Sequence, residues 1–151
     1  MENLRFSILF FLFFFLTGFL LAQEKSSHFK QSYTELNAGF ASNRDWQNGL
    51  KGLPGASFLY GKTHYYKSGF IIDNEIGVAL PVLLTAKIGG GFVINKTEIL
   101  MGIRIFPMNY YTQINFPASK GRWVVSLEKF IPSENSVFPN TYYSFGYRWI
   151  K

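Results

Sequence analysis

The feature that most constrains this chain is a two-residue alternation of apolar with small or polar side chains, repeated along most of the sequence after residue 22. Successive side chains of a β-strand point to opposite faces, so this period is typical of strands. The segment TYYSFGYRWIK, residues 141–151, shows the alternation most sharply. Its aromatic face consists of Tyr143, Phe145, Tyr147 and Trp149. Because no later segment carries a convincing helical period, the sequence predicts an all-β fold.

Turn residues divide the alternating sequence into eight segments of strand length. The expected strands are 33–42, 55–63, 69–80, 83–94, 98–106, 109–116, 122–131 and 141–151. Connections such as 95–97, 107–108 and 117–121 are short enough to join antiparallel neighbours. An even number of strands joined in this way predicts an eight-stranded antiparallel up-and-down β-barrel over residues 33–151.

The first 22 residues have a different character. Met1–Arg5 is a short basic start, Phe6–Leu21 is an apolar run, and Ala22 precedes a polar stretch. This order is typical of a secretory signal, and the run is shorter than the about 20 apolar residues of a membrane-spanning helix. We expect a signal helix at 1–22, a short periplasmic leader at 23–32 and export through the inner membrane. An uncleaved anchor helix is the alternative.

Composition narrows the classes further. The chain contains no cysteine, so an exported fold of this kind is not a disulfide scaffold. It carries 15 Lys and Arg against 9 Asp and Glu, a net charge of +6. If both termini of the barrel lie on the periplasmic side of a membrane, the turns at 64–68, 95–97 and 117–121 lie there too, and most basic residues gather at that end. We expect them to form a ring that faces anionic lipid headgroups rather than nucleic acid. This ring consists of Lys25, Lys30, Lys62, Lys67, Lys96, Lys120, Arg122 and Lys151.

The second face of the strands indicates which side is the interior. It is rich in glycine and serine, which fits eight strands curled around a narrow interior better than a solvated surface. Its charges are of both signs, as enclosed charges must be because each needs a partner. The expected lumen charge network is Glu35, Asp73, Glu75, Lys87, Arg104, Glu128 and Arg148. A solvated face around an apolar interior is the alternative.

The sequence offers little for catalysis. A lipid-modifying enzyme would need a histidine with a serine and an acid beside it, and only His28 and His64 are available. Gly89–Gly91 lies within a strand pattern and leads into no helix, so it is not a phosphate-binding loop. The acidic residues are scattered over the strands and cysteine is absent, so we expect no metal site and no cofactor.

With the strands placed, the chain resembles the small eight-stranded outer-membrane barrels of Gram-negative bacteria, of the OmpX/OmpA transmembrane type. The resemblance rests on the signal segment, the strand count and the closing YYSFGYRW. It implies an outer-membrane location among the lipids there. It also implies that the barrel-assembly machinery recognises the aromatic face of the last strand as an assembly signal.

The expected product is an integral outer-membrane barrel with a closed polar lumen, no open pore and a structural or surface-interaction role. Two longer polar segments, 43–52 and 132–140, would offer a surface to a partner, with Trp46 and Phe138 as its anchors. A soluble periplasmic barrel that holds an apolar ligand and a lipid-modifying enzyme are the alternative functions.

Overall fold

The structure is a computed structural model that describes residues 29–42, 53–80, 83–131 and 141–151. The prediction of an all-β fold is confirmed for these residues, which form eight strands. They are β1 (Phe29–Ser42), β2 (Leu53–Tyr65), β3 (Phe70–Leu80), β4 (Leu83–Ile94), β5 (Thr97–Arg104), β6 (Asn109–Ala118), β7 (Gly121–Phe130) and β8 (Thr141–Ile150). No helix long and apolar enough to cross a membrane occurs in the described ranges.

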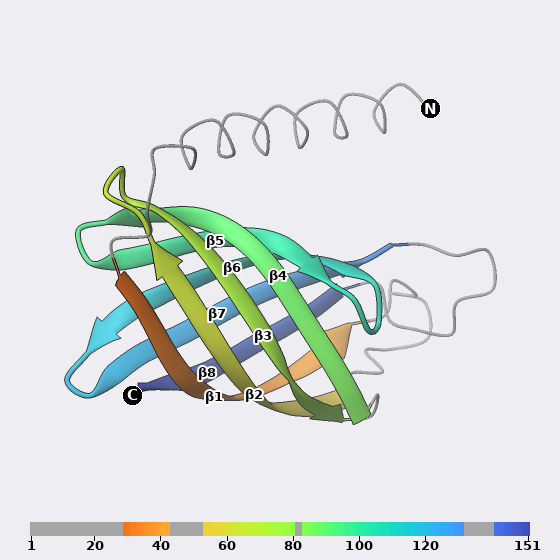
Figure 1. Cartoon of the computed structure of the whole chain (residues 1–151). Coiled ribbons are helices and arrows are strands. Elements are labelled where there is room, and N and C mark those ends of the chain that lie inside the picture. Colours follow the sequence, from red (N-terminus) through yellow and green to blue (C-terminus); the bar gives the residue numbers. More distant parts are fainter. Residues whose placement is uncertain (1–28, 43–52, 81–82, 132–140) are drawn as a thin grey trace, which may run out of the picture.

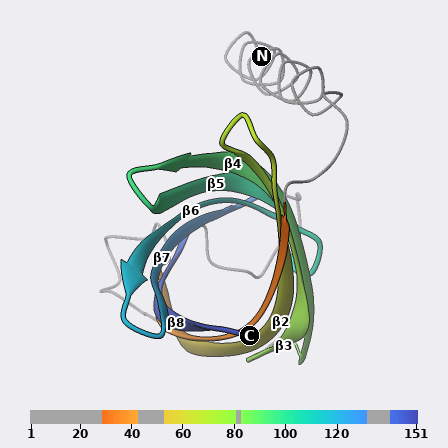
Figure 2. The same cartoon turned by 60° about the vertical axis from the view of Figure 1, so that its left-hand side comes forward.

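The eight strands form a closed barrel (Figure 1). Each strand pairs antiparallel with the next one along the chain, and β8 pairs with β1 from Tyr33 opposite Ile150 to Ser42 opposite Thr141. Figure 2 shows the resulting ring of strands around one interior. The predicted eight-stranded antiparallel up-and-down barrel is therefore confirmed. Closure gives every strand a paired neighbour on both sides, which removes the usual site of edge-to-edge aggregation.

The barrel has two distinct ends. The turn end carries the short connections 66–69, 95–96 and 119–120, and the start of β1 and Lys151 lie there too (Figure 1). The opposite end, called the loop end here, carries the β5–β6 turn at 105–108. Because the strands run up and down, successive connections alternate between the turn end and the loop end.

Most strand boundaries differ from the predicted ones by one or two residues, and the start of β1 differs by four. β1 begins at Phe29 rather than at residue 33, so residues 29–32 belong to the barrel and not to the leader. The reason is continued pairing with β2, where Phe29 lies opposite Tyr65 and the two rings stack at 4.3 Å between centroids. β5 ends at Arg104 because the next four residues form the turn to β6. The predicted signal helix at 1–22 lies outside the described residues.

Large tyrosines fill the narrow interior by lying over glycines of neighbouring strands. A Cβ atom at Gly61 would overlap the ring of Tyr33, and one at Gly89 or Gly102 would overlap Tyr111. Tyr33 and Tyr111 are 1% and 3% exposed. Glycine weakens a strand by itself, so its use here is explained by the space that each ring needs.

Gly89 and its neighbour Gly90 provide a matched test of this packing. Gly89 faces inward, whereas a Cβ at Gly90 would meet the Phe70 ring at 3.2 Å on the outer side. We expect Gly89→Ala to lower the free energy of unfolding by about 1–3 kcal/mol through overpacking. Gly90→Ala should cost less, because only the Phe70 ring has to shift, by a few tenths of an ångström, whereas at Gly89 the Cβ also meets the backbone oxygen of Met101. Urea unfolding of the refolded variants measures both values, and equal effects at the two positions would contradict this packing.

Candidate functional site

Charged side chains lie inside the barrel and apolar ones lie outside it. All five acidic residues of the described ranges are buried, none more than 4% exposed. They are Glu35, Asp73, Glu75, Glu98 and Glu128. Lys87, Arg104 and Arg148 are buried with them. Buried charges are costly unless they are paired and hydrogen-bonded, so the contacts among these groups decide what the interior can be.

Arg148 on β8 is the centre of this interior, with a side chain that is only 2% exposed. Its Nε atom lies 2.8 Å from Glu35 Oε2 on β1. Its Nη2 atom lies 2.6 Å from Glu75 Oε1 and 3.3 Å from Asp73 Oδ2, both on β3. The Tyr33 ring packs on the guanidinium, with its centroid 3.6 Å from Cζ, and its hydroxyl donates to Asp73 Oδ2 at 2.7 Å. One cation therefore donates hydrogen bonds to three carboxylates on two other strands.

A second group of contacts continues from Glu75 towards the loop end. Lys87 Nζ lies 3.7 Å from Glu75 Oε2 and 3.4 Å from Glu128 Oε1. Arg104 Nη2 lies 2.7 Å from the same oxygen of Glu128. The amide of Asn109 donates to the other oxygen of Glu128 at 3.3 Å. Lys87 therefore links the carboxylates around Arg148 to the Arg104–Glu128 pair.

A third group, centred on Glu98 of β5, lies towards the turn end. Its Oε2 atom accepts a hydrogen bond from the Asn115 amide at 2.8 Å and lies 3.8 Å from Arg148 Nη1. Its Oε1 atom lies 3.1 Å from Arg122 Nε and accepts a hydrogen bond from the Tyr65 hydroxyl. Arg122 was predicted in the basic ring at this end of the barrel; its side chain is only 15% exposed and turns towards Glu98. It points inward because its position on β7 has the same parity as buried Val124, Ser126 and Glu128.

The contacts join all seven residues of the predicted lumen charge network into one connected set, which also takes in Glu98 and Arg122. The uncharged partners are the part that the prediction missed. They are Tyr33, Asn37, Thr63, Tyr65, Asn109, Gln113 and Asn115. Strand parity could have found them, because each shares its face with a buried charge on the same strand or on its neighbour.

The outer surface is apolar around the whole ring. Among the described residues, 25 large apolar or aromatic side chains are exposed, from 38% at Ile99 to 69% at Leu83. Every strand contributes at least one of them. A set with one from each strand in turn is Leu36, Phe58, Ile76, Ile88, Met101, Tyr110, Val125 and Phe145. Soluble monomers rarely expose contiguous apolar patches above a few hundred Å², so this belt needs an apolar environment or a covering partner.

The four aromatic residues predicted as an assembly signal project outward from β8. Phe145 stacks on Trp123 of β7 at 5.2 Å between centroids, and Tyr143 stacks on Phe40 of β1 at 5.3 Å. Tyr147 and Trp149 meet edge to face at 5.0 Å. These rings form two aromatic groups on the outer face, one across β7 and β8 and one across β8 and β1, where the barrel closes.

The remaining predicted positions contribute no assembled site. His64 lies near the turn end of β2, opposite Lys30 on β1 and Ile72 on β3, so neither cross-strand neighbour is an acid or a serine. Within the described part of the chain, no group of three His, Asp or Glu residues could hold a metal ion. His28, Trp46, Phe138 and the segments 43–52 and 132–140 lie outside the described residues.

Comparison of the chain with family models, with curated proteins and with solved structures finds no match. The eight-stranded barrel is therefore established by the strand pairing in the structure and not by similarity to a known protein. The resemblance to small outer-membrane barrels therefore rests on the strand pattern and the fold, and membership of that group is part of the proposal below.

Arg148 is the position at which the charge network can be tested. We expect Arg148→Gln to lower the free energy of unfolding by about 3–5 kcal/mol, because carboxylates are left without their cation. Adding Glu35→Gln should restore part of the loss, since Arg148 is the cation that Glu35 contacts. Exposed Lys129 is the control, and Lys129→Gln should change stability by no more than about 0.5 kcal/mol. Urea titration followed by tryptophan fluorescence measures all three variants. Equal losses in the Arg148 and Lys129 variants would contradict a structural role for the network.

Proposed function

We propose that this protein is an integral outer-membrane β-barrel with a closed polar lumen and a structural or surface-interaction role. The observation that carries the proposal is the pairing of an apolar belt contributed by all eight strands with an interior that holds five carboxylates. Membrane barrels alternate apolar residues towards lipid with polar residues towards the lumen. A partner protein would need to surround the whole ring to cover the same belt, whereas lipid does so without specific contacts.

The lumen is closed in this proposal because side chains cross it. An interior enclosed by eight strands is just wide enough for side chains to fill. Arg148 reaches from β8 to carboxylates of β3, and Lys87 on β4 reaches Glu128 on β7. Contacts between strands that are not neighbours occupy the space through which a solute would pass, so we propose no open pore.

The soluble alternative is a periplasmic barrel with an apolar ligand inside. Such a barrel needs an apolar lining, whereas most buried residues of the described ranges are polar or charged. A small buried cluster of Tyr65, Ile71, Leu100 and Tyr111 is present, but these side chains pack on one another. These features favour the membrane proposal over the soluble one.

The lysines suggest how the barrel is oriented. Every charged side chain of the described residues that is exposed is a lysine, and six of the seven lie in the half of the barrel nearest the turn end. The six are Lys30, Lys62, Lys67, Lys96, Lys120 and Lys151. Basic residues beside a membrane are attracted to anionic headgroups. We therefore place the turn end on the periplasmic side and the loop end on the outer side. We propose segments 43–52 and 132–140 as the surface for a partner.

Membrane insertion is tested by fractionation of cells of a Gram-negative host that express the full chain. We expect the protein in the outer-membrane fraction after carbonate and urea washes. On a denaturing gel, unheated samples should migrate differently from boiled ones, because a closed barrel resists the detergent until it is heated. A mature chain that dissolves freely without detergent would refute the proposal.

Arginine substitutions on the outer face can show whether that face is surrounded by lipid or by water. Ile76 lies in the middle of β3 and is 62% exposed, while Ile94 at the turn end of β4 is 55% exposed. In vesicles, Ile76→Arg should cost about 2–4 kcal/mol of unfolding free energy and Ile94→Arg about 0–1 kcal/mol, because the cost falls towards the headgroups. Urea titration of the vesicle-inserted variants gives the difference. A water-exposed barrel would tolerate both changes equally.

A further inference from the structure

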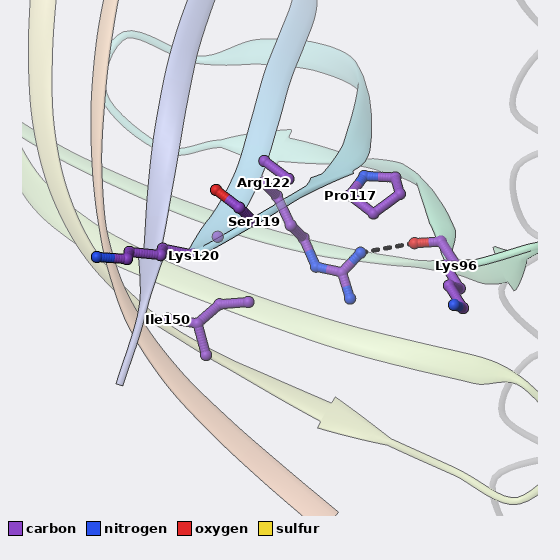
Figure 3. A pocket seen from close by; sticks show the side chains of 8 residues that line it. Lys96, Pro117, Ser119, Lys120, Arg122 and Ile150 are labelled. Atoms are coloured by element: carbon purple, nitrogen blue, oxygen red, sulfur yellow. Dashed lines mark hydrogen bonds between the residues drawn. The ribbon is translucent and has the colours of Figure 1, made fainter.

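The mouth of the barrel at the turn end contains a pocket of about 530 Å³, called the vestibule here (Figure 3). Three cationic residues line it, namely Lys96 from the β4–β5 turn, Lys120 from the β6–β7 turn and Arg122 from β7. Ser119 adds a hydroxyl, and Pro117 and Ile150 add apolar wall. The vestibule therefore combines residues from two separate turns with residues from the ends of β6, β7 and β8.

Arg122 is held in place at the floor of the vestibule. Its Nη1 atom donates to the backbone carbonyl of Lys96 at 2.7 Å, which ties the β6–β7 hairpin to the β4–β5 turn (Figure 3). Its Nε atom faces Glu98 Oε1 at 3.1 Å without making a hydrogen bond. A guanidinium fixed in this way loses little conformational freedom when it binds an anion.

The charge in the vestibule is positive. Glu98 is the acid nearest to Arg122, and it is fully buried and also faces Arg148 at 3.8 Å. Its charge is therefore divided between two arginines and cannot also neutralise the lysines. Lys96 and Lys120 are exposed, and no acidic side chain among the described residues is exposed to compete for them.

We propose that the vestibule binds a phosphate group, carried either by a phospholipid headgroup or by a small soluble phosphate ester. Arginine and lysine donors match phosphate oxygens, and charge-assisted hydrogen bonds of this kind are the strong ones. The pocket has the volume of a small-molecule site, which leaves room for a glycerol or similar group against Pro117 and Ile150. This binding site goes beyond the proposed function. Binding of a soluble phosphate ester requires only that the barrel is folded, whether or not it lies in a membrane.

The experiment uses the full chain refolded in zwitterionic detergent, with backbone amide shifts followed by NMR at constant ionic strength. The probes are inorganic phosphate, glycerol 3-phosphate, and phosphatidylglycerol against phosphatidylcholine in nanodiscs. We expect saturable shifts at residues 96 and 119–122. The double variant Lys96→Gln/Lys120→Gln should bind at least about tenfold more weakly, since charge-assisted hydrogen bonds are lost.

The matched control is Lys62→Gln/Lys67→Gln, which removes the same charge from the same half of the barrel outside the vestibule. It should weaken binding by less than about twofold at fixed ionic strength, because distant surface charges are screened. Saturation by the soluble phosphates supports a soluble ester as ligand, and saturation by phosphatidylglycerol alone supports a lipid headgroup. Equal losses in the two double variants, or no saturable shift at 119–122 with any probe, would overturn the site. The soluble arm stands even if the barrel does not insert into membranes.

Discussion

The structure depends on the contacts of Arg148 with Glu35, Asp73 and Glu75. Arg148 lies on β8, which closes the ring against β1, and the three carboxylates lie on β1 and β3. Enclosed carboxylates without a cation are strongly destabilising. Barrel closure and neutralisation of the interior are therefore one condition, because the strand that completes the backbone pairing also delivers the cation.

This interior differs from a hydrophobic core in how it specifies the fold. Apolar side chains pack in many arrangements, whereas Arg148 and Lys87 each need acids at particular positions on other strands. A shift of one residue in the register would exchange the inner and outer faces of a strand and turn its charges outward. The glycines beneath Tyr33 and Tyr111 add a steric condition of the same kind. The apolar outer face imposes no such specific pairing, and its stabilisation depends on the medium around the barrel.

The strand pattern predicts much of this architecture, because a period of two and short turns are local properties. The number of strands and their antiparallel order follow from the positions and lengths of the turns. The inward position of Arg148 and Glu35 follows from the alternation of side chains along each strand. The extension of β1 to Phe29 did not follow, because it depends on stacking with Tyr65 across the pair. The sharing of Arg148 by acids on β1 and β3 needs the closed ring. The vestibule did not follow either, because it depends on how the β4–β5 and β6–β7 turns lie relative to each other.

The separation of buried acidic side chains from exposed lysines also determines which ions the outer surface can bind. Every side-chain carboxylate of the described residues is enclosed, and the exposed charged side chains there are lysines. Mg²⁺ and Ca²⁺ bind through oxygen ligands, chiefly carboxylates. The described exterior offers these ions no carboxylate with which to bridge the barrel to anionic material. Electrostatic attraction between these lysines and anionic material therefore needs no divalent cation and weakens with added salt.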